Sequence, residues 1–586
     1  MKKITLLIYQ KHANSAVGEL RKLGLMHIKS GHEPQADAIT SFEHRIRDVD
    51  KVLEIIGGTA VQKENLEESN LPSYIKEAID LDSCKQKLVK ELGECEEKGI
   101  WYEEWGNVSL RALRELKEAG LFIKFYSCDK NALKHMPKDK LAYVVRRKPN
   151  KIYIAFVSRD ENESLNFSQA QAPHESLHSL QKRIAGIKEE LKRIEGRLAE
   201  ISVYRNCFLL KKKELLKHLE FYKVRFSMAH SEEVYCLEGF CPKKAVYKIV
   251  EAAKIHGWAT VIQDPDKPAE TPTLIRNPKW IEIIKPIFKF MGTVPGYNEY
   301  DISLWFLIFF SIFFAMLVGD AGYGFLFLAA TFFAQRKFKK AQENIFFLLY
   351  LLSGGTVVWG ALTGTWFGFE KIAQLPVLNY FVIDSINSFV GSNQIFMIYL
   401  CFFIGAIHLT IAHGIRAFRF INSRLALSQI GWISIVWSVF FIAGKLVLNR
   451  AVPAVTLPLF VFGASLVILF SYPEKNIFKG ALLSLSDFPL KVISSFSDVV
   501  SYLRLFAVGY ATVAVAMAFN NMALGSGVDS IFSGIMAAMI LFVGHTLNIL
   551  LALMAVVVHG IRLNILEFSG HLDMAWSGKE YTPFKD

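Results

Sequence analysis

The feature that most constrains this chain is a series of long apolar segments that fills its second half. A helix needs roughly 20 apolar residues to cross the hydrocarbon core of a bilayer. We count eight such segments after Asp301, at 302–319, 321–335, 344–366, 394–413, 427–448, 456–472, 496–519 and 530–568. The sequence therefore predicts an all-α polytopic membrane domain of about eight helices within residues 291–586.

The first 290 residues are charged and mixed in pattern, and they predict a separate α+β domain. Between Leu177 and Ile201, apolar residues recur with alternating spacings of three and four, which is the seam of a coiled coil. A second seam runs from Phe42 to Ile56. Two seams separated by a folded segment predict an antiparallel coiled-coil hairpin with a globular tip. An ordinary helical bundle is the alternative.

Strand-like segments flank the predicted hairpin at both ends. The run Lys2–Tyr9, with similar runs near 26–29, 233–240 and 258–263, predicts a small α/β lobe built from residues 1–35 and 224–265. The arms of the hairpin would be 38–100 and 175–222, and residues 101–174 would form a second, distal lobe. Only a short apolar run follows Lys2 and Lys3, so we expect no cleavable signal peptide and a cytoplasmic domain.

Basic residues gather in three of the connections between the apolar segments, and such residues stay on the cytoplasmic side of a membrane. They are Arg336, Lys337, Lys339, Lys340, Arg416, Arg419, Arg424, Lys475, Lys479 and Lys491. This bias predicts a multi-pass cell-membrane protein with both termini in the cytoplasm. It also explains the net charge of +12, so we expect no nucleic-acid partner. The seven cysteines form no CxxC pair, and we expect reduced thiols.

Arg504 lies inside one of the apolar segments, where a cation costs at least ~2.5 kcal/mol to insert. Arginine stays protonated at physiological pH, so it can attract or gate an ion but cannot relay protons by titrating. The residues near it on the same helix face are small or medium in size, Ser501 among them, and none is acidic. The countercharge must come from another helix or another protein. A structural arginine paired within the bundle is the alternative.

The last apolar segment is unusually long and carries a second set of polar residues. An unbroken helix over 530–568 would measure roughly 58 Å, about twice the hydrocarbon thickness, so it must tilt strongly or break. Arg562 and Glu567 are five residues apart, about 140° around an α-helix, and do not make an ideal ion pair. The alternative to a functional role is that both residues simply mark the cytoplasmic interface. Other polar residues further up mark a hydrated route or interhelical hydrogen bonds. These are His545, Asn548 and His559.

A glycine-rich turn with Asp320 joins the first two apolar segments. Asp320 is either a turn residue or a polar group near an exit path for ions. His408 and His413, in the fourth segment, we interpret as structural or interfacial. The sequence lacks a phosphate-binding loop and the common hydrolase and metalloprotease motifs. We therefore expect no cofactor, no metal and no nucleotide or hydrolytic site in this chain.

The run Ser501-Tyr-Leu-Arg504-Leu-Phe-Ala-Val-Gly resembles the arginine-helix signature of the a/I subunit of V-type and A-type rotary ATPases, the large membrane stator subunit. Gly560-Ile-Arg562-Leu-Asn-Ile-Leu-Glu567-Phe568 is similar to its second-arginine segment. Further landmarks occur in the family's order, and the resemblance covers the whole chain. The modest length is that of the prokaryotic I-type subunit.

The resemblance implies a stator subunit that forms ion half-channels against a rotating proteolipid c ring and couples H⁺ or Na⁺ translocation to ATP hydrolysis or synthesis. Arg504 and Arg562 would face the ring. The candidates for half-channel residues are Glu567, His559, Asn548, His545, Ser501 and Asp320. Implied partners are peripheral stalk subunits of the E/G type, the lipid membrane and, indirectly, the central stalk and a nucleotide-binding A/B head.

The chain departs from the eukaryotic family pattern at two positions. Thr512 stands where that pattern has a histidine eight residues after the first arginine, and Ala552 stands where it often has an acid ten residues before the second. The half-channel chemistry and the coupling ion therefore stay open. A standalone secondary transporter with a cytoplasmic regulatory domain is the alternative to the stator function.

Overall fold

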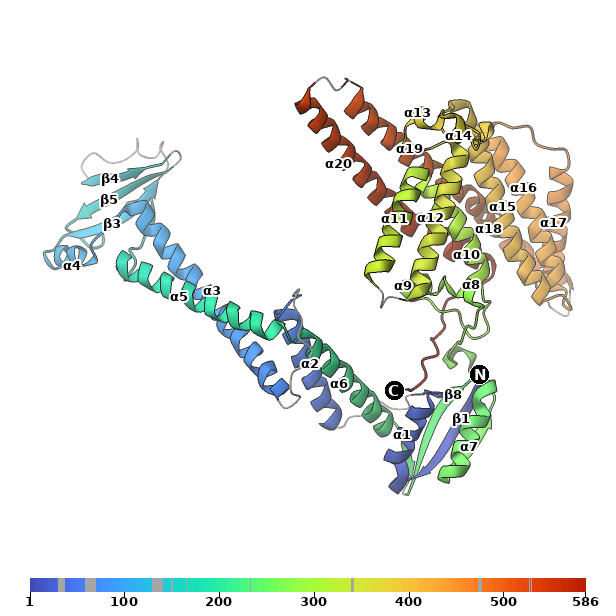
Figure 1. Ribbon diagram of the computed structural model, residues 1–586, viewed down its shortest axis with the longest axis horizontal. Coiled ribbons are helices and arrows are strands. Elements are labelled where there is room, and N and C mark those ends of the chain that lie inside the picture. Colours follow the sequence, from blue (N-terminus) through green and yellow to red (C-terminus); the bar gives the residue numbers. More distant parts are fainter. Residues whose placement is uncertain are drawn as a thin grey trace.

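The computed structural model describes the whole chain except residues 30–36, 58–69, 129–140, 149–150, 166, 232, 339–341, 473–476, 526, 528–529 and 586. Lys339, Lys340 and Lys475, used above for orientation, and the expected lobe boundary at residue 35 lie outside the described residues. The molecule is mostly helical, with an α/β lobe beside a helical bundle and a long helical arm that ends in a second sheet (Figure 1).

The lobe at the N-terminus is a five-stranded antiparallel sheet in the order β2-β8-β1-β9, with β7 paired to β8. Its strands are β1 (Lys2–Tyr9), β2 (His27–Ile28), β7 (Ala229–Ser231), β8 (Val234–Cys241) and β9 (Ala259–Gln263). Ile4, Leu6 and Ile8 alternate along β1 and are buried in one core with residues of α1 (Ala13–Leu23) and α7 (Val246–His256). The two halves of this sheet come from opposite ends of the first 263 residues.

Two helix pairs form the arm. Helix α2 (Asp37–Ile55) packs against α6 (Arg205–Phe226), and α3 (Leu71–Trp105) packs against α5 (Leu177–Ser202). The apolar seam of α5 supplies buried core residues, Ile187 among them, and faces α3. Within the expected return arm, 175–222, the chain turns at residues 203–204, which separate α5 from α6. The coiled-coil hairpin itself stays a prediction.

The far end of the arm carries a four-stranded antiparallel sheet in the order β4-β5-β3-β6. Its strands are β3 (Phe122–Cys128), β4 (Ala142–Arg147), β5 (Ile152–Ser158) and β6 (Ser168–Ala170), and α4 (Leu110–Glu118) precedes them. Trp101 and Trp105, in the last turns of α3, meet Phe125 of β3 edge-on at 5.1 Å between ring centroids. This aromatic cluster fixes the sheet to the end of the arm.

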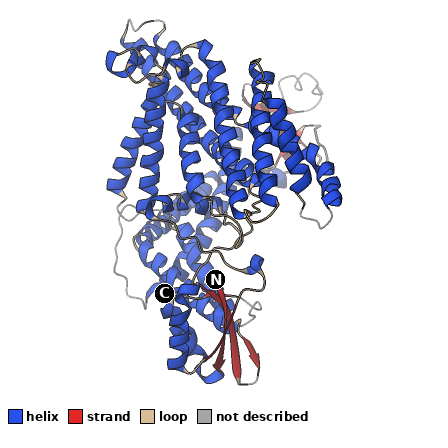
Figure 2. Ribbon diagram, turned by 90° about the vertical axis from the view of Figure 1, so that its right-hand side faces the viewer, coloured by secondary structure: helices blue, strands red, loops and turns tan. Residues whose placement is uncertain are grey.

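The second half of the chain is a bundle of apolar helices (Figure 2). Its long helices are α10 (Ser303–Val318), α11 (Ala321–Lys337), α12 (Glu343–Thr363), α15 (Gln394–Arg419), α16 (Leu425–Leu448), α17 (Thr456–Phe470), α18 (Ile477–Ser501), α19 (Leu503–Leu524) and α20 (Ile531–Ala555). Short helices α8 (Lys279–Glu282), α9 (Lys285–Met291), α13 (Glu370–Ala373) and α14 (Pro376–Asn379) lie in the connections. Two π-helical segments, Val556–Gly560 and Leu563–Phe568, and then α21 (Ser569–His571) extend α20.

Five stretches of the described chain are long and apolar enough to span a membrane, or six if α10 and α11 are counted as one broken span. The axes of α10 and α11 differ by 118°, and α17 is shorter than a full span. Helices α18 and α19 belong to one apolar stretch, so the seventh expected segment begins earlier than predicted. The protein therefore has the helices of a membrane domain, and the count of eight stays a prediction.

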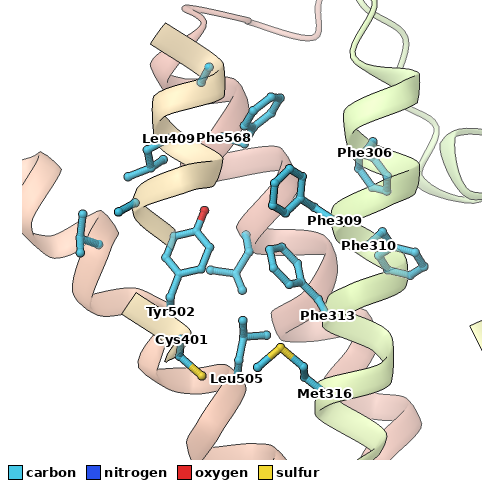
Figure 3. Close-up of a cluster of buried hydrophobic side chains, with 14 of the residues drawn as sticks. Phe306, Phe309, Phe310, Phe313, Met316, Cys401, Leu409, Tyr502, Leu505 and Phe568 are labelled. Carbon is cyan, nitrogen blue, oxygen red and sulfur yellow. The ribbon is translucent and has the colours of Figure 1, made fainter. Parts of the chain in front are cut away.

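Helix α10 lies at the centre of the bundle. Its phenylalanines, including Phe309 and Phe313, form one core with Tyr502, Leu505 and Phe568 from the end of the chain (Figure 3). Helices α19 and α20 run side by side and lean away from the other helices (Figure 1). Packing of this kind holds the last two helices against α10 at one end and leaves their other end projecting.

The C-terminal tail returns from the membrane domain to the N-terminal lobe. The amide of Gly578 donates to the carbonyl of Val294 at 3.1 Å, and the amide of Phe584 donates to the carbonyl of Met26 at 2.9 Å. The Phe584 ring is only 3% exposed and is part of the lobe's core, with the Arg21 guanidinium 5.6 Å above it. The two ends of the chain thus stabilise the same lobe.

We predict that Phe584→Ala destabilises the N-terminal lobe by about 3 kcal/mol or more, because the substitution leaves a cavity in its core. Hydrogen exchange of the β1 and β8 amides measures this free energy of opening. Tyr247→Ala is the matched control, since that ring lies on α7 and is 63% exposed. Equal protection in the two variants would contradict a structural role for the tail.

Candidate functional site

The two intramembrane arginines share one carboxylate. Arg504 Nη2 lies 3.4 Å and Arg562 Nε lies 3.7 Å from the same oxygen, Oε1 of Glu567. The hydroxyl oxygen of Ser501 lies 3.2 Å from that oxygen. Glu567 is buried, with 4% of its side chain exposed, whereas the side chains of Arg504 and Arg562 are 27% and 52% exposed. The acid thus lies inside the bundle and the guanidiniums lie toward its surface.

The sequence did not predict the pairing of Arg562 with Glu567. On an α-helix, residues five apart point about 140° away from each other. The structure forms π-helical turns here, in Leu563–Phe568, whose hydrogen bonds join residues five apart. The wider turn brings Arg562 and Glu567 onto nearby faces, but their contact at 3.7 Å is too long for a hydrogen bond, which agrees with the expectation that they do not make an ideal pair. For Arg504, the countercharge comes from another segment of this chain, which is also what the alternative of a structural arginine paired within the bundle predicts.

The charges of this cluster do not balance. Two guanidiniums face a single carboxylate, which leaves one positive charge in excess. Among the described residues, Arg504 Nη1 and Glu567 Oε2 are buried without a hydrogen-bond partner. Exposed apolar side chains surround Arg562 on the same segment, Val558 at 52% and Leu566 at 58%. A partly exposed cation on such an apolar face fits an acidic group from a neighbour.

His559 lies close to both arginines, three residues before Arg562, and its Nδ1 is buried without a hydrogen-bond partner among the described residues. The structure thus brings together Arg504, Arg562, Glu567, Ser501 and His559 of the residues predicted from the sequence. The other three candidates lie elsewhere. Asp320 directly precedes α11, and His545 and Asn548 lie on α20.

A second polar network lies further along α19 and α20. The Tyr323 hydroxyl is 2.7 Å from His545 Nδ1, and the amide of Asn548 donates both to that hydroxyl at 3.0 Å and to the carbonyl of Thr512 at 2.8 Å. His545 Nε2 is 3.1 Å from Asn520 Oδ1. Thr512 is eight residues, or roughly 12 Å, along α19 from Arg504. His545 and Asn548 therefore belong to one network, which is buried except at the half-buried His545. Its other members, Tyr323 and Asn520, were not predicted from the sequence.

Asp320 is the N-cap of α11 and has a structural arrangement. Its Oδ1 accepts from the backbone amides of Gly322, Tyr323 and Phe367 at 2.8, 3.2 and 2.9 Å, and its Oδ2 accepts from Gly368 at 3.0 Å. Asp320 as a whole is 2% exposed. Four backbone donors occupy the carboxylate and fix the reversal after α10 to the loop after α12. Of the two readings of Asp320, this geometry favours the turn residue.

A third polar group connects α15, α16, α18 and α21. His571 Nε2 is 3.0 Å from Asp498 Oδ2, His571 Nδ1 is 3.0 Å from His413 Nε2, and His413 Nδ1 is 2.9 Å from Gln429 Oε1. We interpreted His413 as structural and did not single out His571 or Asp498, because the three residues are far apart in the chain. His408 lies stacked between Phe309 and Phe568, with its Nδ1 2.8 Å from the Tyr502 hydroxyl. Among the described residues, no group of three or more potential ligands could hold a metal ion.

The fold and the site define a polytopic membrane protein with paired intramembrane arginines and a large appended α/β domain. Residues 132–352 match the model of the V-type ATPase 116kDa subunit family. The V-type ATP synthase subunit I of Borreliella burgdorferi is 30% identical over 615 aligned positions, covering 100% of this chain and 99% of the relative. The V-type ATP synthase subunit I 1 of Treponema pallidum is 26% identical, with 100% and 99% covered.

The A-type ATP synthase subunit I of Methanocaldococcus jannaschii is 28% identical over 68% of this chain and 64% of the relative. A crystal structure of the cytoplasmic N-terminal domain of subunit I, homolog of subunit a, of V-ATPase aligns with 45% of this chain and 100% of that one, at 17% identity and a TM-score of 0.26. From the full-length match at 30% identity, the chain belongs to the subunit I family of V-type and A-type ATP synthases, as its arginine motif indicated. It is a membrane subunit of a multi-subunit rotary ATPase that serves ion transport.

We predict that Asp320→Asn lowers the melting temperature of the detergent-solubilised protein. The amide replaces one acceptor oxygen with a donor and leaves a buried backbone amide unpaired, at a cost of about 1–3 kcal/mol. Asp384→Asn, in an exposed connection, is the control and should melt as the wild type does. Normal melting of Asp320→Asn together with lost ion transport would instead assign Asp320 to the ion path.

Proposed function

We propose that this chain is the stator subunit that forms the ion half-channels against a rotating proteolipid c ring, and couples H⁺ or Na⁺ translocation to ATP hydrolysis or synthesis. The observation that carries the proposal is the unbalanced cluster, in which Arg504 and Arg562 share the single buried carboxylate of Glu567. The excess positive charge lies at the start of α19 and on the π-helical extension of α20, where the side chains of Arg504 and Arg562 are 27% and 52% exposed.

In this mechanism the two arginines act on an acidic residue of each ring subunit. In lipid that carboxyl group is most stable when an ion neutralises it, because burial penalises the charged form. At about 4 Å and an effective dielectric constant of about 20, a guanidinium stabilises the ionised carboxylate by about 4 kcal/mol. The ring acid therefore releases its ion as it reaches the arginines, and the fixed charge blocks direct leakage between the half-channels.

Glu567 has a different role from the ring acid. By accepting from Arg504 and lying near Arg562, it reduces the cost of placing two cations in the bundle and holds both guanidiniums in one orientation. Because one carboxylate cannot neutralise two guanidiniums, a ring carboxylate still meets a net positive charge.

The two other polar clusters support half-channels on opposite sides of Arg504. Toward α21, Ser501 and Glu567 lead to the group around His571. In the other direction lies the Tyr323, His545 and Asn548 network. There His545 of α20 supplies the imidazole that the family pattern has on the first arginine's helix, so this network compensates for Thr512.

A small cavity lies beside α19 near its contact with α10. It measures about 30 Å³, enough for one or two water molecules, and its lining includes Asn387, Gln394, Tyr510 and Gly509. Gln394 donates to the Tyr510 hydroxyl at 2.9 Å. The lining is mostly apolar, but its few polar side chains support a hydrated route that reaches α19 beyond Arg504.

The N-terminal part would connect the ion site to the rest of the complex. We assign residues 1–290 to a cytoplasmic domain, with the helical arm as a coiled-coil hairpin, and residues 291–586 to the membrane domain. The arm and its distal sheet would bind peripheral stalks of the E/G type and resist torque from the nucleotide-binding head. We assign the C-terminus to the same, cytoplasmic side, because the tail contacts the N-terminal lobe.

We predict that Arg504→Ala abolishes coupled transport in the assembled complex. An interaction of about 4 kcal/mol corresponds to roughly a thousandfold in an equilibrium constant, so ion release from the ring acid should fail. Arg504→Lys should fail as well, because lysine cannot offer a planar, permanently charged group. ATP-driven ion uptake into proteoliposomes measures the effect, and Arg450→Ala, at an exposed site, is the control. Full pumping by Arg504→Ala would refute the assignment.

We predict that a proteolipid ring, stalk proteins and nucleotide-binding subunits copurify with this chain from native membranes. The standalone secondary transporter makes the opposite prediction, namely ion transport by the purified chain alone. Mass spectrometry of the solubilised complex and flux measurements on the isolated chain in vesicles decide between the two.

A further inference from the structure

The file formed by Asp498, His571, His413 and Gln429 is a second polar site of the membrane domain. Three consecutive contacts of 2.9–3.0 Å join its four side chains, which come from α18, α21, α15 and α16. His413 and Gln429 are buried, the His571 side chain is 13% exposed, and the Asp498 side chain is 28% exposed. The file therefore reaches the protein surface at its Asp498 end and ends in the interior at Gln429.

The directions of these hydrogen bonds determine how many protons the file holds. The Gln429 carbonyl oxygen only accepts, so His413 Nδ1 must carry a hydrogen. A neutral His413 then accepts through Nε2, and His571 Nδ1 must donate to it. His571 Nε2 faces a carboxylate oxygen, and that contact also needs a hydrogen. With this amide orientation, one proton is shared between His571 and Asp498 beyond the neutral imidazoles and ionised carboxylate.

A second arrangement satisfies the same contacts without that proton. If the Gln429 amide turns so that its NH₂ group faces His413, each imidazole donates through Nε2 and accepts through Nδ1. The carboxylate of Asp498 then accepts from a neutral His571. The two arrangements differ by one proton, which is taken from or returned to water at Asp498, and by the orientation of one amide.

Two of the four segments that form the file, those with Asp498 and His571, also adjoin the arginine cluster. Asp498 lies three residues before Ser501, whose hydroxyl reaches the Asp498 carbonyl at 2.7 Å and Glu567 at 3.2 Å. His571 lies four residues after Glu567. The charged and titratable groups around the file are Arg416 and His408 on α15, Asp573 after α21, Glu567 on the π-helical segment, and Arg504 and Tyr502 near the start of α19.

We propose that Asp498, His571 and His413 form a proton-holding site at the mouth of the half-channel that leads to Glu567 and Arg504, with Gln429 setting its hydrogen-bond direction. The proposal rests on the proposed function and assigns the proton as the ion that uses this mouth. The net charge of the file changes by one unit as it fills and empties. It thus holds a proton close to the arginine cluster, which matters most when protons in the surrounding solution are scarce.

The first test is transport by the reconstituted complex as a function of pH on the ATP side, over a range of about 5.5 to 9. Glutamine has no titratable nitrogen, so His571→Gln should reduce proton pumping by roughly tenfold at the alkaline end and by about twofold or less at the acid end. Asp498→Asn should show the same profile, and Asp498→Glu should restore it. His178→Gln, at an exposed position on α5, is the matched control.

The second test detects the proton without transport. Magnetic-resonance spectra of the intact complex with isotope-labelled histidine should contain an imidazolium signal that disappears in His571→Gln and on raising the pH. Copurification of the other subunits shows that each variant assembles. A flat pH profile for the ratio of His571→Gln to wild type, or the lack of that imidazolium signal at any pH, would overturn the proposal.

Parallel measurement of Arg504→Ala separates this proposal from the proposed function. If Arg504→Ala is inactive while His571→Gln and Asp498→Asn follow the wild-type profile, only the proton-holding site is refuted, and the same holds if the complex transports Na⁺ alone. If Arg504→Ala pumps normally, the stator function fails first.

Discussion

Two guanidiniums that share one buried carboxylate set the conditions for the rest of this membrane domain. Arg504 and Arg562 come from different helices. The carboxylate of Glu567 lowers the free-energy cost of placing both guanidiniums in an apolar bundle. Because the acid is inside and the bases are toward the surface, the cluster holds its own geometry and still presents positive charge outward. A protein that needed only to stabilise its fold would gain more from apolar packing at this position.

The backbone around this cluster is adapted to it. The π-helical segments Val556–Gly560 and Leu563–Phe568 occur where α20 would otherwise continue as a regular helix, and they rotate Glu567 toward Arg562 and the bundle interior. At the other side of the core, the carboxylate of Asp320 gathers four backbone amides and fixes the reversal of α10 into α11. One acid thus orients side chains and another orients backbone, both within the same group of helices.

Much of the fold follows from local patterns. The alternation in β1, the seam of α5 and the apolar run of α15 each determine their element within a few residues. The arginine motif located the site because a cation in an apolar helix is itself informative. The helix count was less secure, since α10, α11 and α17 have 16, 17 and 15 residues and lie at the limit of membrane length. The break between α5 and α6 and the contacts of Tyr323, Asn520 and His571 depend on tertiary packing. The pairing of Arg562 with Glu567 depends on a helix type that residue spacing does not reveal.

The C-terminal tail packs on the N-terminal lobe, so the chain forms a loop that is closed by noncovalent contacts. Residues 572–585 run from α21, near the arginines, to the N-terminal lobe at the base of the helical arm, where the side chain of Phe584 is buried. A sideways force at the distal sheet therefore reaches the arginine cluster by two routes, through α8–α10 and through the tail. Neither the arm nor the bundle can then rotate freely about the other. A single linker would have behaved as a swivel, whereas this double attachment makes the joint between arm and bundle a hinge with a restricted axis.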